Sequence, residues 1–423
     1  MNHATITLII IGIMCIMYIV DKFPVALVTL LGMLAMVYCG ILPFKDAFGN
    51  FGSTPVLLTG GMVIIIDAII DSGVIVRFEH VLQKLSSGGE KLFGTAVMIS
   101  AGIISMFTNN SALVVMFMPF IASLARSARG KITKKHLYLP LAVGGLIGGT
   151  GTLAGSTAPL LANEVLEITG QKQFGFFTTA PVSLSVLFVV ALCYWLFLYD
   201  LSVRWFDFDE IETKGTIIEG PAFSMRNAVI SLIVFAAAVF CFIVRPFNWD
   251  LGLVAVTGAA IVVLFRCVDA RKELQNMMWG AILTLGAALA VADGFVKSGA
   301  GDVVIKWLLQ VFGNIITNGK FMVALFILAG WLLSMFMSNG SLVSMLASVA
   351  IPLAITYGVN PTPVAIACVM GANLAMATPV ATTTITMVQV AGYRFKDYFR
   401  FGGLVGVIGV VTAWASIVLI YRL

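Results

Sequence analysis

The sequence predicts an all-α polytopic membrane protein with two inverted repeats of five transmembrane helices, each with a re-entrant helical hairpin and a broken helix. Three observations lead to this fold class. The 423-residue chain is 60% hydrophobic and 11% charged, with a mean hydropathy of +1.03, whereas soluble domains carry roughly 25% charged residues. Its apolar segments approach the roughly 20 residues that cross a bilayer. Landmarks of the first half also recur, in the same order, in the second half.

The recurring landmarks indicate an internal duplication. GGMVIIIDAIIDSGV (60–74) matches GAALAVADGFVKSGA (286–300) at an offset of 226. A polar break then follows in each half, in MFTNNSALVVMF (106–117) and in MFMSNGSLVSML (335–346), where the offset is 230. GGTGTLAGSTAPLL (148–161) corresponds to GANLAMATPVATTT (371–384).

The spanning helices follow from the apolar runs between these landmarks. We expect those of the first half near residues 5–20, 23–40, 54–71, 136–168 and 176–200, and those of the second near 226–245, 249–267, 276–297, 362–391 and 399–421. Double segments at 92–127 and 320–357 carry the Asn-containing breaks, and amphipathic stretches at 75–85 and 302–312 are expected at the membrane interface. The first repeat is placed at 1–200, a cytoplasmic linker at 201–225 and the second repeat at 226–423. An odd number of spans in each repeat makes the repeats inverted.

Basic residues predict the orientation in the membrane. In this arrangement 18 of the 25 Lys and Arg residues fall on one side and 7 on the other. The positive-inside rule makes the richer side cytoplasmic. We therefore expect a multi-pass protein of the plasma (inner) membrane with both termini extracytoplasmic.

The polar breaks are the candidate functional site. Non-helical backbone at membrane depth must be buried in protein or line a wet cavity. Tight turns between full spans would explain the Asn breaks, but not the second breaks at 148–159 and 371–384, which fall midway along the fourth helix of each half. Helix N-termini that meet near the midplane suit an anion, and unwound carbonyls suit sodium. Neutral donors and acceptors would come from Thr108, Asn109, Asn110, Ser338, Asn339, Thr378, Thr382 and Thr383.

The paired Asn breaks, GGTGTLAG, ATPVATTT and GYRFKDYFRFG resemble the divalent-anion:sodium symporters of the ion transporter superfamily, over essentially the whole chain. The resemblance implies a dimeric elevator with a scaffold domain and a moving transport domain. It also implies two Ser-Asn-Thr hairpin tips that contact a substrate carboxylate and help to form two sodium sites. Thr108, Asn109 and Asn110 take these places at the first tip. At the second, Ser338 and Asn339 match, whereas Gly340 stands where Thr is usual.

Together these inferences assign the site residues. Substrate binding is expected at Thr108, Asn109, Asn110, Ser338, Asn339, Gly340, Thr382 and Thr383, and sodium binding at Thr108, Asn109, Gly151, Ser338, Asn339 and Thr378. The expected function is symport of a small organic anion, most simply a di- or tricarboxylate, with sodium as the coupling ion and no cofactor. The expected partners are the anion, sodium, the lipid bilayer and a second copy of the chain. No nucleic acid is expected, because cytoplasmic loops account for the net charge of +5.

Alternative functions are a sulfate or other inorganic oxyanion transporter and a cation/proton antiporter of the same superfamily. An antiporter would need an ionisable group at the midplane, and the breaks contain none. A membrane-embedded hydrolase is excluded, since it would need a Ser–His pair or paired aspartates deep in the membrane. His80 and His136 are expected at the surface, and Asp67 and Asp293 lie in helices of opposite orientation. The roles of Asp67, Asp293 and Glu164 stay open.

Overall fold

The computed structural model describes residues 2–20, 23–73, 89–127, 132–208, 223–244, 249–277, 279–301, 303, 317–335, 339–378 and 382–423. The amphipathic stretch expected at 75–85 and nearly all of the one at 302–312 lie outside these residues. So do Ser338 and most of the linker expected at 201–225.

The described residues form helices and connecting turns, with no strand among them. The first half contains α1 (His3–Val20), α2 (Val25–Tyr38), α3 (Phe44–Gly49), α4 (Thr54–Asp71), α6 (Glu90–Ser105), α7 (Asn110–Ser127), α8 (Lys134–Gly148), α9 (Thr157–Ile168), α10 (Ala180–Cys193) and α11 (Tyr199–Trp205). A π-helical stretch, Tyr194–Leu198, joins α10 to α11.

The second half contains α12 (Met225–Val244), α13 (Leu251–Leu264), α14 (Ala270–Asn276), α15 (Trp279–Lys297), α17 (Gly319–Leu333), α18 (Asn339–Thr356), α19 (Pro361–Asn373), α20 (Thr383–Met387), α21 (Phe395–Asp397) and α22 (Gly403–Tyr421). Polar side chains begin several of them, because the first backbone N–H groups of a helix need acceptors. Asp250 accepts from the N–H groups of Gly252 and Leu253 before α13, and Asn360 accepts from Thr362 N–H in α19.

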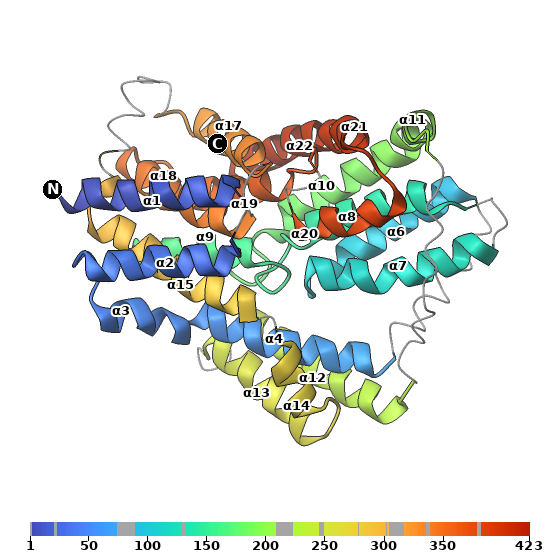
Figure 1. Ribbon diagram of the computed structural model, residues 1–423, viewed down its shortest axis with the longest axis horizontal. Coiled ribbons are helices and arrows are strands. Elements are labelled where there is room, and N and C mark those ends of the chain that lie inside the picture. Colours follow the sequence, from blue (N-terminus) through green and yellow to red (C-terminus); the bar gives the residue numbers. More distant parts are fainter. Residues whose placement is uncertain are drawn as a thin grey trace.

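Helical breaks lie where the glycine-rich and threonine-rich landmarks predict them. The segment expected at 136–168 is interrupted between the end of α8 and the start of α9. The segment expected at 362–391 is interrupted between α19 and α20. In Figure 1 the hairpin of α6 and α7 extends to the right of these breaks and that of α17 and α18 to the left.

Glycines bring the hairpins into backbone contact with the broken helices. A Cβ at Gly148 of α8 would lie 1.9 Å from the carbonyl oxygen of Gly102 in α6, and one at Gly371 of α19 would lie 2.5 Å from that of Ile327 in α17. Small residues allow this close approach of helices in a membrane. The packing of α6 on α8 therefore matches that of α17 on α19.

The two halves exchange their third long helix. α4 of the first half packs against α12 and α13, whereas α15 of the second half packs against α1 and α2. Figure 1 shows α4 beside α12 and α13 at the bottom of the view, and α15 beside α2. Each of these two groups therefore contains helices from both halves of the chain.

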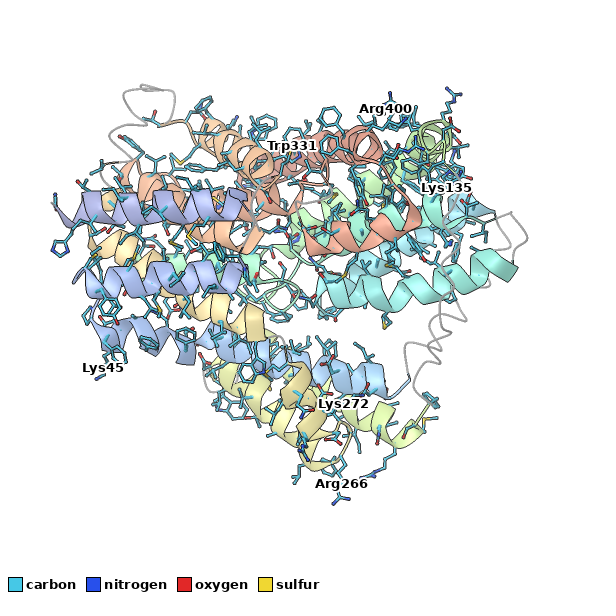
Figure 2. All side chains as sticks on the ribbon, in the orientation of Figure 1. Lys45, Lys135, Arg266, Lys272, Trp331 and Arg400 are labelled. Atoms are coloured by element: carbon cyan, nitrogen blue, oxygen red, sulfur yellow. The ribbon has the colours of Figure 1, made fainter. Side chains whose placement is uncertain are left out.

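Four helical stretches in the described parts of the chain are long and apolar enough to cross a bilayer: Phe44–Asp71, Ala180–Trp205, Met225–Phe242 and Phe395–Tyr421. Others are apolar but shorter, among them Gly319–Leu333 and Leu342–Thr356 in the second hairpin. Figure 2 shows Lys135 and Arg400 toward the right of the molecule and Lys45 at its left edge. Lys272 and Arg266 lie near the bottom of the same view, between these two ends.

Candidate functional site

Both hairpin tips contain the same side-chain hydrogen bond. Ser105 Oγ donates to Asn110 Oδ1 across 2.7 Å, and Ser334 Oγ donates to Asn339 Oδ1 across 2.8 Å. Asn110 and Asn339 are the first residues of α7 and α18. The tips therefore correspond at an offset of 229, and the offset of 230 taken from the sequence is one residue too long. By this geometry Asn110, rather than Asn109, is the counterpart of Asn339.

A threonine of each helical break holds the adjacent hairpin turn. Thr152 Oγ1 donates to the carbonyl oxygen of Met106, and Thr378 Oγ1 donates to that of Met335 across 2.9 Å. Thr152 Oγ1 also accepts from Ala154 N–H at 3.1 Å. Each tip is thus attached to the broken helix of its own half by equivalent bonds.

Each tip also contacts the broken helix of the other half. Ser111 Oγ, at the start of α7, lies 3.1 Å from Thr384 Oγ1 of α20. Gly340, at the start of α18, lies against α9, because a Cβ at Gly340 would be 3.0 Å from Thr157 Oγ1. Both hairpin tips and both helical breaks therefore meet in one region.

The tips differ in what surrounds their asparagine. Asn339 Nδ2 donates to Asn373 Oδ1 across 3.0 Å, and Asn373 Nδ2 in turn donates to the carbonyl of Val369 across 2.9 Å. Asn110 instead packs against Gly149, where a Cβ would lie 2.1 Å from Asn110 Oδ1. The second tip is therefore fixed by an amide pair and the first by backbone contact.

One buried, unpaired hydroxyl lies at the start of α9. Ser156 occupies its N-cap position without a capping bond, and Ser156 Oγ is buried with no hydrogen-bond partner among the described residues. α7, α9 and α18 all begin in this region, and helix N-termini carry partial positive charge. The sequence places no Lys, Arg, Asp or Glu in 105–111, 149–157, 334–340 or 373–384. Neutral hydroxyls, amides and backbone groups are therefore available to an anion and a small cation.

The structure gathers most of the residues that the sequence assigned to the site. Thr108, Asn110 and Thr378 are buried, with Asn109 half-buried beside them, and Asn109 Oδ1 accepts from Ser111 N–H at 2.9 Å. Gly151 lies in the first break, against Met106. Thr382 caps α20 by accepting from Ile385 N–H at 3.2 Å, and Thr383 begins that helix.

Sequence reasoning missed several polar residues of this region: Ser105, Thr152, Ser156, Thr157, Ser334 and Asn373. The duplication could have found some of them, since Ser105 and Ser334 are 229 apart and Thr152 and Thr378 are 226 apart.

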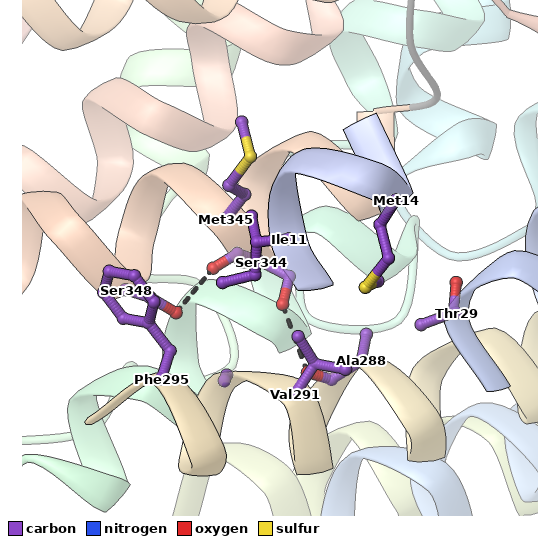
Figure 3. A pocket seen from close by; sticks show the side chains of 10 residues that line it. Ile11, Met14, Thr29, Ala288, Val291, Phe295, Ser344, Met345 and Ser348 are labelled. Atoms are coloured by element: carbon purple, nitrogen blue, oxygen red, sulfur yellow. Dashed lines mark hydrogen bonds between the residues drawn. The ribbon is translucent and has the colours of Figure 1, made fainter. Parts of the chain in front are cut away.

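A separate cavity of about 30 Å³ lies between α1, α2, α15 and α18. Figure 3 shows Met14, Phe295 and Met345 on its walls, with Ser348 bonded to Ser344 and Ser344 bonded to the backbone of Ala288. Its volume suits about one water molecule. No residue assigned to the site lines it, so it marks an imperfect fit between α18 and the other three helices.

The burial of His136 differs from what the sequence predicted. The sequence placed it at the surface, but it is only 6% exposed, and its Nδ1 lies 3.1 Å from Glu90 Oε2. Tyr199 covers this pair and donates from its hydroxyl to Glu90 Oε2 at 2.8 Å. The α10–α11 extension buries the start of α8, and this long-range contact has no local signal in the sequence.

Comparison with protein families finds one matching model, described as CitMHS, citrate transporter, over residues 13–329. An uncharacterised transporter of Methanocaldococcus jannaschii is 22% identical over 352 residues, covering 81% of this chain and 78% of the relative. The sodium-dependent dicarboxylate transporter SdcS of Staphylococcus saprophyticus is 24% identical over 403 residues, covering 86% and 76%.

Two solved transporter structures share the fold at low sequence identity. The YdaH transporter of Alcanivorax borkumensis superposes with a TM-score of 0.63 at 14% identity, covering 92% of this chain and 89% of that one. MtrF of Neisseria gonorrhoeae, described as an antimetabolite efflux pump, has a TM-score of 0.60 at 14% identity, covering 99% and 94%.

Proposed function

Because this chain belongs to the citrate transporter family, we propose that it is a secondary active transporter that moves a di- or tricarboxylate together with sodium. The resemblance to divalent-anion:sodium symporters is confirmed by the family match and by the SdcS relatives. The family and the relatives are transporters rather than enzymes, as the sequence predicted.

The meeting of the two hairpin tips with the two helical breaks supports this proposal most strongly. The tips present Asn110 and Asn339, and the starts of α7, α9 and α18 present N–H donors. An asparagine amide can donate to an oxyanion through nitrogen and offer its oxygen to a cation. A dicarboxylate between the tips would place one carboxylate near each asparagine.

Sodium supplies the positive charge that the side chains of the breaks lack. We place it near Thr108, Asn109 and Gly151 at the first tip, and near Ser338, Asn339 and Thr378 at the second. The carbonyls of Met106 and Met335 lie in the two hairpin turns, beside Thr152 and Thr378. Sodium and a carboxylate close to one another each improve the site for the other, which couples their binding. The sodium dependence of SdcS is consistent with this assignment.

The proposed architecture is a dimeric elevator of inverted repeats with re-entrant hairpins. Repeats at 1–200 and 226–423, joined by a cytoplasmic linker at 201–225, agree with the matching order of elements and with hairpins that extend in opposite directions in Figure 1. α1, α2, α4, α12, α13 and α15 would form the scaffold. The hairpins, broken helices, α10 and α22 would form the moving part, with both termini outside the plasma (inner) membrane.

Sulfate or another compact oxyanion is the second candidate substrate. Gly340 favours it, because the second tip lacks the hydroxyl that Ser111 supplies at the first. The helix N-termini and the buried Ser156 hydroxyl would suit an oxyanion with no second carboxylate.

Uptake into proteoliposomes tests the proposal. Purified chain would be reconstituted and offered labelled succinate, citrate or sulfate, with external sodium replaced by potassium or choline in parallel samples. We expect sodium-dependent uptake of succinate or citrate and none in protein-free liposomes. Uptake of sulfate alone would select the second candidate. Uptake indifferent to sodium would contradict the coupling ion, and uptake of none of the three would contradict the substrate class.

A further inference from the structure

Glu164 is a buried carboxylate that the anion and sodium site does not use. It lies in α9, about two turns after Thr157, and is only 7% exposed. Glu164 Oε2 is buried and has no hydrogen-bond partner among the described residues. An ionised carboxylate in that position has a large desolvation cost unless it is paired or neutralised. The described arrangement therefore favours a proton or a cation at Glu164.

The charged groups around Glu164 increase this requirement. α15, which carries Asp293, packs against α9, so the charge of Asp293 acts on Glu164, and Asp293 is itself only 9% exposed. Lys297 contacts Asp293 at 2.8 Å, but it also contacts Asp46 of α3 at 3.1 Å. One ammonium group is thus shared by two carboxylates. Glu167, one turn further along α9, is exposed and adds a second negative charge.

The other helices packed on α9 supply no positive charge within the described residues. α18 carries no charged side chain, and the titratable group of α19 is the buried thiol of Cys368. In α4, Asp67 and Asp71 interact with Glu273 of α14. Apart from Lys297, which Asp293 and Asp46 share, the described neighbours of Glu164 are therefore neutral or negative.

A proton fits this site better than a metal ion. A metal cation needs several oxygen ligands, whereas Glu164 Oε2 has no hydrogen-bond partner among the described residues. We propose that Glu164 is a proton-binding site and that the protein takes up one proton as α9 packs against α15. The proton comes from water and bonds to a carboxylate oxygen, which leaves a neutral acid and removes the repulsion from Asp293.

Proton binding would also enter the transport cycle. In the proposed elevator α9 moves and α15 does not, so each cycle separates Glu164 from Asp293. Release of the proton on separation would carry it across the membrane with sodium and the anion. This second step rests on the proposed function, whereas proton binding in the described state does not.

Thermal unfolding in detergent tests proton binding without any substrate. Wild-type chain, Glu164→Gln, Glu164→Leu and Glu167→Gln would be melted from about pH 5 to about pH 8. Wild type should lose melting temperature relative to Glu164→Gln and Glu164→Leu as the pH rises, by a few degrees, because only wild type must bury a charge. Glu167→Gln is the matched control and should follow wild type, since its side chain is exposed. Parallel curves for wild type and both Glu164 variants would overturn the proposal.

Two further measurements distinguish a proton from a cation at Glu164, and proton binding from transport. At high pH, stabilisation by sodium chloride over choline chloride in Glu167→Gln and wild type, but not in Glu164→Gln, would show a cation site and overturn the proton assignment. In proteoliposomes that contain a pH-sensitive dye, wild type and Glu167→Gln should move protons with citrate, and Glu164→Gln should move fewer protons per citrate. A thermal effect without uptake of citrate, succinate or sulfate would support proton binding and contradict the proposed function.

Discussion

Asn339 Nδ2 donates to Asn373 Oδ1 across 3.0 Å, which links the tip of the second hairpin to the end of α19. Asn339 Oδ1 is engaged by Ser334 Oγ at 2.8 Å. The orientation of the Asn339 amide is therefore set from both ends. Since Ser105 and Asn110 repeat the Ser–Asn bond in the first hairpin, the pair Asn110 and Asn339 defines how the two tips correspond.

Alanine at either asparagine should reduce transport strongly. Asn110→Ala and Asn339→Ala each remove an amide that we place against a charged substrate, and a hydrogen bond to a charged group contributes about 1.5–3 kcal/mol, or roughly 10-fold to 100-fold in affinity. Labelled succinate and citrate uptake would measure the loss. Asn109→Ala should have a smaller effect if the offset of 229 is correct. Asn227→Ala, in α12 and away from the tips, is the control. Full uptake by both tip variants would mean that the hairpins are only turns.

Valine at the break threonines should weaken sodium binding. Thr378→Val and Thr152→Val keep the side-chain shape but remove the hydroxyl that holds the hairpin turn. Loss of one hydrogen bond, about 1 kcal/mol, should raise the sodium concentration for half-maximal uptake roughly fivefold. Thr257→Val is the matched control, because the Thr257 hydroxyl bonds only to the Leu253 carbonyl within α13, on an exposed face. An unchanged sodium requirement in Thr378→Val would remove Thr378 from the sodium site.

The sequence was informative wherever a local pattern decides the structure. Runs that contain Gly, Thr and Pro lower the stability of a regular helix. The breaks after Gly148 and after Asn373 could therefore be located from residue types alone. The one-residue error in the tip register has a physical cause. Asn109 and Asn110 are adjacent and chemically alike, and only the bond to Ser105 shows which one begins α7 at the place of Asn339.

Long-range packing could not be predicted in the same way. The exchange of α4 and α15 between the halves depends on contacts between residues some 200 positions apart, such as the hydrogen bond from Thr54 to Asp250. Burial of His136 depends on Tyr199 folding back over α8. Neither contact leaves a periodicity or a motif in the sequence. The burial of His136, and likewise that of Glu164, could therefore be recognised only from the fold.

Reporter fusions should show the two halves in opposite orientations. Fusions after Lys135 and after Leu423 are expected to report the cytoplasmic and the outer side respectively, because the basic residues favour the cytoplasm for the first position. A fusion after Lys45, at the opposite end of the structure from Lys135 in Figure 2, should agree with the Leu423 fusion. If the fusions after Lys135 and after Leu423 report the same side of the membrane, the inverted repeats are contradicted.

Alanine at Gly148 should destabilise the first hairpin. The added Cβ would lie 1.9 Å from the Gly102 carbonyl oxygen, so α6 and α8 must separate. Overpacking of this kind costs about 1–3 kcal/mol, which a lower melting temperature in detergent would show. Gly12→Ala in α1 is the control, because nothing lies within 4 Å of its added Cβ. Equal melting temperatures for the two variants would indicate that the α6–α8 contact is looser than described.

Glu90 should make the stability of the protein depend on pH in the acidic range. Glu90 precedes the apolar hairpin segment. Burial alone would raise its pKa, but hydrogen bonds from His136, Thr133 and Tyr199 outweigh burial and hold the pKa below its ordinary value of 4.5. A carboxylate whose pKa is lowered by folding stabilises the native state above the unfolded value, and this contribution is lost as the pH falls through the folded value. Glu90→Gln should therefore lower the melting temperature at neutral pH, and the difference from wild type should narrow as the pH falls below 4.5.

The exposed Asp200, which pairs with Lys91 at 2.8 Å, gives the control variant Asp200→Asn. Little change in melting temperature is expected for it, because surface ion pairs contribute at most about 1 kcal/mol. A difference between Glu90→Gln and wild type that stays constant from neutral to acidic pH would show that the Glu90 charge does not hold this end of the hairpin.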